Sequence, residues 1–177
     1  MKEFPRIETE RLILSQLKEE DLPLVVEYLQ SKIFSDLTSN IPSPYTVDDA
    51  KFWLNNSQQA FESGSGFTFA IRNQNDQIIG AIGLHDRGDD KAELGYWLGA
   101  SFWNKGYITE AAKAIIDFGF NELNLNKIYA THLLHNPASG KVLEKIGMEK
   151  EALLKQHLKK NGEYFDIPMY SVFKNKD

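Results

Sequence analysis

The sequence predicts an α/β (α+β) domain in which a single mixed, mostly antiparallel sheet of about seven strands carries helices on both faces. Between residues 66 and 99, three short runs alternate apolar and polar positions and are separated by turn residues, as in an antiparallel meander. From Ile108 the apolar residues recur at helical spacing, and a β-rich run follows at residues 126–134. A helix that connects two strands in this way makes them parallel neighbours in the sheet.

The chain before this meander is expected to form one strand and two helices. Residues 11–17 are predicted to form the strand, and residues 18–30 a helix with acidic side chains in its first turn, where the helix dipole favours them. After a proline-rich loop, Thr46 and Asp49 form an N-cap pair, because their oxygen atoms can bond the free N–H groups of a helix start. That second helix is predicted to run from Val47 towards Phe61.

The end of the chain is predicted to contain a short helix and a hairpin. Asn136 fits the N-cap of the helix and Gly147 its C-terminal stop. Asn161 and Gly162 form the dipeptide most typical of a tight β-turn, so the last two strands are expected to pair around it. Pro168 indicates an irregular or edge position in the last strand, because proline cannot donate a hydrogen bond to a neighbour.

Composition restricts the kinds of function. The 177 residues fit one domain spanning 1–177, and none is cysteine, which excludes disulfides, thiolate metal sites and a cysteine nucleophile. A formal net charge of −5 argues against general nucleic-acid binding. The N-terminal residues lack the apolar centre of a signal peptide, and no apolar window approaches ~20 residues. We therefore expect a cytoplasmic protein that binds neither membranes nor nucleic acid.

Residues 101–111, SFWNKGYITEA, connect the last strand of the meander to the following helix. If this helix begins near Gly106, the backbone N–H groups of residues 104–109 lack partners within it and carry partial positive charge, which favours phosphate. Gly106 lets a ligand approach the backbone closely, and Lys105 and Thr109 can add side-chain donors. The alternative is a plain strand-to-helix turn, since neither common glycine-rich nucleotide-binding motif is present.

Four segments and the terminal hairpin, taken in order, resemble the GNAT superfamily of N-acetyltransferases. The segments are ETERLIL at residues 8–14, ELGYWLG at 93–99, FWNKGYITEA at 102–111 and NPASGKVLEKIGM at 136–148. Within the superfamily the chain is most similar to the branch that contains the Rim-type ribosomal-protein N-terminal acetyltransferases. The resemblance implies the acyl-CoA N-acyltransferase (GNAT) fold, acetyl-CoA as co-substrate and an amine as acceptor.

The resemblance also implies where the coenzyme binds. In the superfamily, the pyrophosphate of acetyl-CoA lies on the loop that residues 103–109 match, with the usual pattern Gln/Arg-x-x-Gly-x-Gly/Ala. Trp103 occupies the Gln/Arg position here and Ile108 the small one, so phosphate binding is expected to depend on backbone N–H groups, Lys105 and Thr109.

Pantetheine is implied to lie between the two parallel strands, hydrogen-bonded like another strand, with a nearby backbone N–H polarising the thioester carbonyl. The alternative is an ordinary buried strand, in which Tyr96 and Leu98 are simply core residues. The implied coenzyme-binding residues are Trp97, Leu98, Gly99, Trp103, Asn104, Lys105, Gly106, Tyr107, Ile108, Thr109, Asn136 and Ser139.

Glu93 is the candidate base for the acceptor amine, because it lies on the strand beside the expected thioester, where the resemblance favours a carboxylate. Alternation places it on the opposite sheet face from Tyr96 and Leu98. His85 is the second candidate, since the ordinary histidine pKa suits a base. The alternatives are an exposed strand glutamate and a loop histidine. An α-amine with a pKa of about 8 is also partly neutral at neutral pH, so its acetylation depends less on a base.

Ser139 is the candidate group for assisting coenzyme departure. Many superfamily members carry a tyrosine seven positions after the Asn of this motif, but Leu143 stands there in this chain. The resemblance suggests Ser139 in its place, where it would hydrogen-bond the coenzyme sulfur or orient a water, and Asn136 as a contact for pantetheine. The alternative is that Ser139 only satisfies backbone N–H groups at the helix start.

The acceptor is expected to be a protein N-terminal α-amine first and a small amine or amino acid second, taken up by direct transfer into a cleft formed by residues 34–45 and the terminal hairpin. A non-catalytic acyl-CoA-binding regulatory protein is the alternative, and both a monomer and a homodimer stay open. His132 and His135 form H-x-x-H, but on a strand they face opposite ways, so no metal site is expected.

Overall fold

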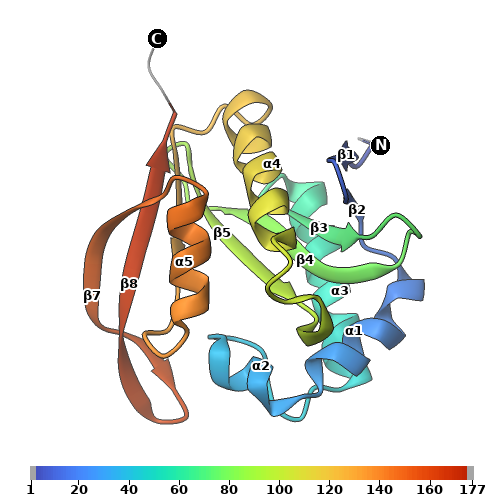
Figure 1. The fold of residues 1–177 in the computed structure, drawn as a ribbon, viewed down its shortest axis with the longest axis horizontal. Helices are drawn as coiled ribbons and strands as arrows, with labels where there is room; N and C mark the ends of the chain where they lie inside the picture. The colour runs from blue at the N-terminus through green and yellow to red at the C-terminus, as the bar shows by residue number, and fades with distance from the viewer. Residues whose placement is uncertain (1–2, 175–177) are drawn as a thin grey trace.

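The computed structural model describes residues 3–174, which form one eight-stranded sheet with helices on both faces (Figure 1). The strand order is β1-β2-β3-β4-β5-β6-β8-β7. The strands are β1 (Ile7–Glu8), β2 (Ile13–Gln16), β3 (Gly66–Arg72), β4 (Ile78–Asp86), β5 (Lys91–Leu98), β6 (Lys127–Thr131), β7 (Glu149–Lys160) and β8 (Glu163–Phe173). The helices are α1 (Leu22–Leu29), α2 (Lys32–Leu37), α3 (Val47–Ser63), α4 (Tyr107–Asn121) and α5 (Pro137–Lys145), with short 3₁₀ turns η1 (Glu19–Asp21) and η2 (Ala100–Phe102).

The predicted mixed, mostly antiparallel sheet is confirmed, and the eighth strand is the two-residue β1 that pairs with β2. Strands β3, β4 and β5 form the expected meander, and β5 and β6 are parallel neighbours as predicted. The β5–β6 pairing covers only Lys91, Ala92 and Glu93 of β5. Beyond Glu93 the two strands are no longer paired, so the second half of β5 presents an open backbone edge.

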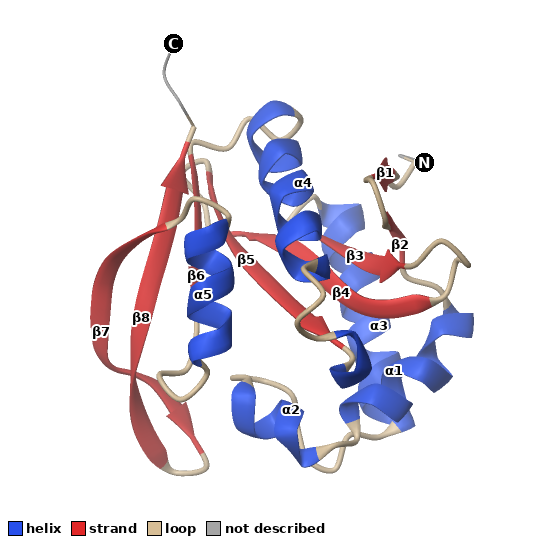
Figure 2. Ribbon diagram, in the orientation of Figure 1, coloured by secondary structure: helices blue, strands red, loops and turns tan. Residues whose placement is uncertain are grey.

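The helices lie in two groups, one on each face of the sheet (Figure 2). Helices α4 and α5 cover one face, and α1 and α3 cover the other. The predicted N-cap of α3 is confirmed, since Thr46 accepts from the Asp49 N–H and the Asp49 carboxylate accepts from the Thr46 N–H. The structure adds α2, a short helix in the segment that the sequence left between the first two helices.

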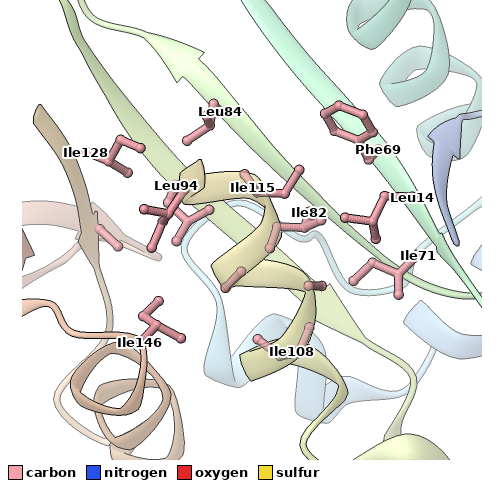
Figure 3. Close-up of a cluster of buried hydrophobic side chains, with 14 of the residues drawn as sticks. Leu14, Phe69, Ile71, Ile82, Leu84, Leu94, Ile108, Ile115, Ile128 and Ile146 are labelled. Carbon is pink, nitrogen blue, oxygen red and sulfur yellow. The ribbon is translucent and has the colours of Figure 1, made fainter. Parts of the chain in front are cut away.

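The larger core lies between α4 and the sheet (Figure 3). Ile115 of α4 is fully buried, and Figure 3 shows it among side chains from several strands, including Ile82 and Leu84. A Cβ on Gly119 would lie only 2.7 Å from Ile128 Cδ1, so a larger residue there would force the Ile128 side chain of β6 to shift. None of the helices in residues 3–174 is long and apolar enough to cross a membrane.

The terminal hairpin is confirmed, because Asn161 and Gly162 both have the positive φ that its two-residue turn requires. Strand β8 is not an edge strand, since it lies between β6 and β7. Pro168 nevertheless occupies a local edge position in β8, as predicted. The last residue that pairs with β6 is Met169, so Pro168 lies just beyond that pairing and needs no N–H on this side.

Candidate active site

A first cavity of about 490 Å³ lies between the open edge of β5, the start of α4, and α5. Nearly all of the residues that the sequence analysis assigned to the coenzyme line this cavity. Those that line it are Trp97, Leu98, Trp103, Asn104, Gly106, Tyr107, Ile108, Thr109, Asn136 and Ser139. Gly99 and Lys105 are not among the lining residues; the Gly99 N–H donates to the Ile79 carbonyl of β4, and Lys105 Nζ donates to the Ser101 carbonyl.

The start of α4 offers unpaired backbone donors to this cavity. Gly106 is the N-cap residue, and it provides no side chain to bond the first N–H groups of the helix. Its φ of 78° is in the left-handed region, which explains why glycine stands there. The first N–H groups of an α-helix have no partner within the helix and concentrate its positive dipole end. This corner of the cavity is therefore suited to an anion.

The loop before α4 is fastened to the end of β5 by Trp103, whose indole N–H donates to the Leu98 carbonyl at 2.6 Å. Hydrogen-bonded pairs alternate along an antiparallel ladder, and the pair formed by Gly99 and Ile79 is one of them. The backbone groups of Tyr96 and Leu98 therefore point to the open edge. With the Leu98 carbonyl taken by Trp103, the Tyr96 groups and the Leu98 N–H are left for a ligand.

Glu110 ties the start of α4 to the N-terminal segment. Its carboxylate accepts from Thr9 Oγ1 at 2.6 Å and from the backbone N–H and Nε of Arg11 at 2.8 Å and 2.7 Å. Burial alone would raise the pKa of Glu110, but the hydrogen bonds from Thr9 and Arg11 outweigh it and lower that pKa. Arg11 also donates to the Lys105 carbonyl and lies over the Tyr107 ring. The expected anion site is thus held in place from outside the cavity.

A second cavity of about 680 Å³ lies on the opposite face of β5, against α3 and the segment after α2. Residues 37–42 and Tyr45 line it, which fits the segment expected at the acceptor cleft. The terminal hairpin contributes none of the lining residues that the structure describes. Both base candidates, Glu93 and His85, line this cavity. They are direct partners on β5 and β4, so the two lie side by side.

Arg87 pairs with Glu93, an interaction that sequence reasoning missed. Its Nη2 and Nε donate to Glu93 Oε2 at 2.8 Å and 3.1 Å. The pKa of His85 lies below the ordinary histidine value, because burial and the Arg87 charge lower it more than the Glu93 charge raises it. His85 is therefore neutral at neutral pH.

The two cavities meet at a junction, which we define as the residues that line both. They are Leu37, Thr38, Tyr96, Trp97, Asn136 and Ser139. At the junction, Ser139 Oγ and Tyr96 Oη are 2.8 Å apart. Asn136 caps α5 as predicted, since its Oδ1 accepts from the Ser139 N–H, while its Nδ2 donates to the Leu37 carbonyl. Leu143, in the place of the missing tyrosine, is fully buried.

A profile of the acetyltransferase (GNAT) domain matches residues 11–149. The chain belongs to the GNAT family. The uncharacterized N-acetyltransferase YnaD of Bacillus subtilis is 32% identical over 172 residues, covering 96% of this chain and 98% of YnaD. The crystal structure of a GNAT-family acetyltransferase from Bacillus anthracis matches with a TM-score of 0.86 at 27% identity, over 96% of this chain and 98% of that one. The predicted GNAT fold and N-acetyltransferase activity are thereby confirmed.

Other similar GNAT proteins differ in their acceptors. The ribosomal protein uS5 alanine N-acetyltransferase of Escherichia coli is 32% identical over 109 residues, covering 59% of this chain and 56% of that protein. RimL, a ribosomal-protein acetyltransferase solved with coenzyme A, matches in fold with a TM-score of 0.87 at 18% identity, over 96% of this chain and 98% of that one. Spermidine N-acetyltransferase of Vibrio cholerae, solved with CoA and spermine, matches with a TM-score of 0.79 at 21% identity, over 93% and 96%.

The two histidines considered for a metal have other partners in this GNAT domain. His132 Nδ1 lies 2.8 Å from the Leu133 carbonyl oxygen, and His135 Nε2 lies 2.7 Å from that of Asp36. Among residues 3–174, no group of three or more histidine, aspartate or glutamate side chains is arranged to hold a metal ion.

The end of α2 is bonded to the opposite wall of the site, a set of contacts that we call the α2 bridge. His135 and Asn136 meet the carbonyls of Asp36 and Leu37, and Lys160 of the hairpin donates to the Thr38 carbonyl at 2.7 Å. Sequence reasoning missed this bridge because no local pattern marks it. It also missed Lys141 and Lys145 of α5, which line the first cavity opposite the start of α4.

Proposed function

We propose that this GNAT enzyme binds acetyl-CoA in the first cavity and transfers its acetyl group to an amine in the second. The observation that carries the proposal is the junction, where the lining of two cavities on opposite faces of β5 meets beside an open strand edge. A thioester at the junction would be reachable from both sides. The chain has no cysteine to carry the acetyl group, so the amine attacks the thioester directly.

The pyrophosphate is assigned to the start of α4, where backbone N–H groups of residues 104–109 would bind it. The uncapped Gly106 supports this assignment, as do Lys141 and Lys145, whose positive charges lie in the same cavity. Lys105 takes part only if its ammonium leaves the Ser101 carbonyl. Pantetheine is assigned to the open edge of β5, where the free backbone groups of Tyr96 and the Leu98 N–H can bond it like another strand.

Glu93 is assigned as the base that receives the proton of the attacking amine. Glu93 lines the second cavity, and its carboxylate is paired with the Arg87 guanidinium. His85 is the second candidate, because a neutral imidazole can also accept a proton. Ser139 is assigned to hydrogen-bond the departing sulfur, because its hydroxyl lies at the junction. The Asn136 side chain, not the Ser139 hydroxyl, accepts the backbone N–H at the start of α5.

The acceptor is proposed to be the α-amine of a protein N-terminus. The relative that acetylates the alanine of a ribosomal protein supports this choice, and the second cavity of about 680 Å³ has room for more than one residue of a peptide. A small amine is the second candidate, favoured by the fold likeness to a spermidine acetyltransferase.

Release of coenzyme A, measured with a panel of N-terminal peptides and small amines, tests the proposed function. Saturable turnover that depends on the peptide is the expected result, with spermidine and free amino acids poorer by at least tenfold in kcat/KM, about 1.4 kcal/mol in transition-state binding. Saturable binding of acetyl-CoA without any acceptor-dependent turnover would instead identify a non-catalytic acyl-CoA-binding protein. The same assay with ribosomal-protein N-termini separates a Rim-type acceptor from other peptides.

A further inference from the structure

Tyr96 brings a second hydroxyl group to the junction. Its Oη lies 2.8 Å from Ser139 Oγ and 3.4 Å from the Ser139 carbonyl oxygen. Both residues line both cavities, and they come from different elements, β5 and α5. A core role for Tyr96 was the alternative from the sequence, and its ring does pack against the α4 side of the sheet. The hydroxyl at the end of this ring nevertheless reaches the site.

We propose that Tyr96 is a positioning residue, which rests on the role proposed for Ser139: its hydroxyl donates to Ser139 Oγ and so directs the Ser139 hydrogen toward the coenzyme sulfur. A serine hydroxyl has one hydrogen and rotates freely when nothing restrains it. A donor on its oxygen leaves the hydrogen free for another acceptor. Because the Tyr96 ring is fixed by packing in the core, the orientation is set before the substrates bind.

The pair stabilises the leaving thiolate by hydrogen bonding and delivers no proton to it. Burial raises the pKa of Tyr96 to about 12. An ordinary thiol has a pKa of about 8.5, so proton transfer from Tyr96 to a thiolate would be unfavourable by roughly a thousandfold or more. During transfer the thioester C–S bond breaks, the amide C–N bond forms, and the amine proton passes to the base. Both hydroxyl groups keep their protons.

A double-mutant cycle on Tyr96→Phe and Ser139→Ala tests the coupling through turnover. Tyr96→Phe removes only the hydroxyl, so we expect kcat to fall roughly three- to tenfold while the Kd for acetyl-CoA is unchanged. In the Ser139→Ala background the same change should have no further effect, and in the Ser139→Thr background its effect should return. Tyr170→Phe is the matched control, because this buried tyrosine has its hydroxyl near Gly140 of α5.

Titration of bound coenzyme A gives a readout that needs no acceptor. The thiol pKa of coenzyme A, followed by thiolate absorbance in the complex, should be lower with the native protein than with Tyr96→Phe or Ser139→Ala. Absence of amine turnover would overturn the proposed function but not the role of Tyr96. The thiol titration still tests that role if the native protein binds coenzyme A. Additive losses of kcat in the double variant, or an unchanged thiol pKa in Tyr96→Phe, would overturn the role of Tyr96.

Discussion

At the residue scale, the acceptor side of the site depends on how β4 and β5 present their side chains. Glu93 bonds Arg87 through Oε2, and its Oε1 accepts no hydrogen bond from the part of the chain that the structure describes. One carboxylate oxygen is therefore held by the guanidinium, which leaves the other available to a ligand. This arrangement orients the carboxylate at the position that we propose for the base.

Glu93→Gln should reduce turnover more strongly at about pH 6.5 than at about pH 9. An α-amine with a pKa of about 8 is mostly protonated at the lower pH, where it needs a base, and mostly neutral at the higher one. The pH profile of kcat/KM for a peptide acceptor measures the difference. Equal losses at both pH values would show that Glu93 has a structural role and is not the base. The pH profile of kcat/KM for His85→Gln would then test His85 as the base.

Gly95 lies between Glu93 and Trp97 on the acceptor face of β5. Nothing lies within 4 Å of the place where its Cβ would stand, and its φ is not positive, so neither packing nor backbone conformation requires glycine there. A glycine inside a strand often marks the close approach of a ligand. We infer that its missing side chain leaves room for the acceptor.

The series Gly95→Ala and Gly95→Leu should raise the KM of the acceptor in steps, by roughly tenfold or more for leucine, because each side chain fills part of the second cavity. The Kd for acetyl-CoA and the melting temperature should stay close to their native values. Isothermal titration with acetyl-CoA and steady-state kinetics with a peptide measure the two effects separately. A parallel loss of coenzyme affinity would contradict the inference.

At the element scale, the start of α4 is defined by the left-handed conformation of Gly106. Proline cannot adopt this φ, since its ring fixes φ near about −65°, so a proline there would disrupt the loop as a whole. Alanine can adopt it at a cost of about 1–2 kcal/mol. Its methyl group would lie 3.4 Å from an Arg11 nitrogen, an ordinary contact.

Gly106→Ala should therefore weaken acetyl-CoA binding beyond its effect on stability. Gly64→Ala is the matched control, because Gly64 has a φ of 74°, no atom near its Cβ position and a place at the far end of α3. Both variants should lower the melting temperature to a similar extent, but only Gly106→Ala should raise the Kd for acetyl-CoA. If the two variants bind the coenzyme equally well, the pyrophosphate does not lie at this helix start.

The elements that the sequence predicted are those with local signals. Thr46 and Asp49 cap α3 from within three residues, and Asn161 with Gly162 determine the hairpin turn directly. Helix α2 has no such signal, and its last carbonyls are satisfied by His135, Asn136 and Lys160, which lie far along the chain. The contact between Tyr96 and Ser139 spans 43 positions. The alternation of residues along a strand predicts the sheet face on which a side chain lies, but not which residues the end of that side chain contacts.

At the scale of the whole molecule, a buried ion pair joins the N-terminal part of the chain to the meander. Arg72 of β3 and Asp21 of η1 are 2% and 5% exposed, and their two hydrogen bonds measure 2.7 Å and 2.8 Å. The guanidinium also donates to Ser15 Oγ and the Gln16 carbonyl of β2. Three segments, β2, η1 and β3, therefore meet at one side chain.

Arg72→Met should destabilise the protein by about 3–5 kcal/mol, because it leaves the Asp21 carboxylate buried without its partner. The double variant Arg72→Met with Asp21→Leu should be more stable than the single one, since no uncompensated charge is left. Urea unfolding at neutral pH measures both. If the double variant has a lower free energy of unfolding than Arg72→Met, the unpaired Asp21 charge is not the cause of the loss of stability.

The contacts of Glu110 make stability depend on pH. Its pKa is lower in the folded protein than in the unfolded chain, so its contribution is complete above the unfolded value of about 4.3 and disappears as pH falls through the folded value. Glu110→Gln should therefore lower the melting temperature at pH 7 and have progressively less effect below about pH 4. A difference that stays constant over this range would assign the contribution to packing instead of charge.

The α2 bridge bears on the order in which substrates arrive and leave. It places Leu37 and Thr38 at the junction, between two cavities that are each open to solvent. With acetyl-CoA in the first cavity and the amine in the second, as we propose, neither has to depart before the other binds. We therefore expect a ternary complex, in which free coenzyme A competes with acetyl-CoA for the first cavity and leaves the second accessible, so that an acetylated product can dissociate while coenzyme A is still bound.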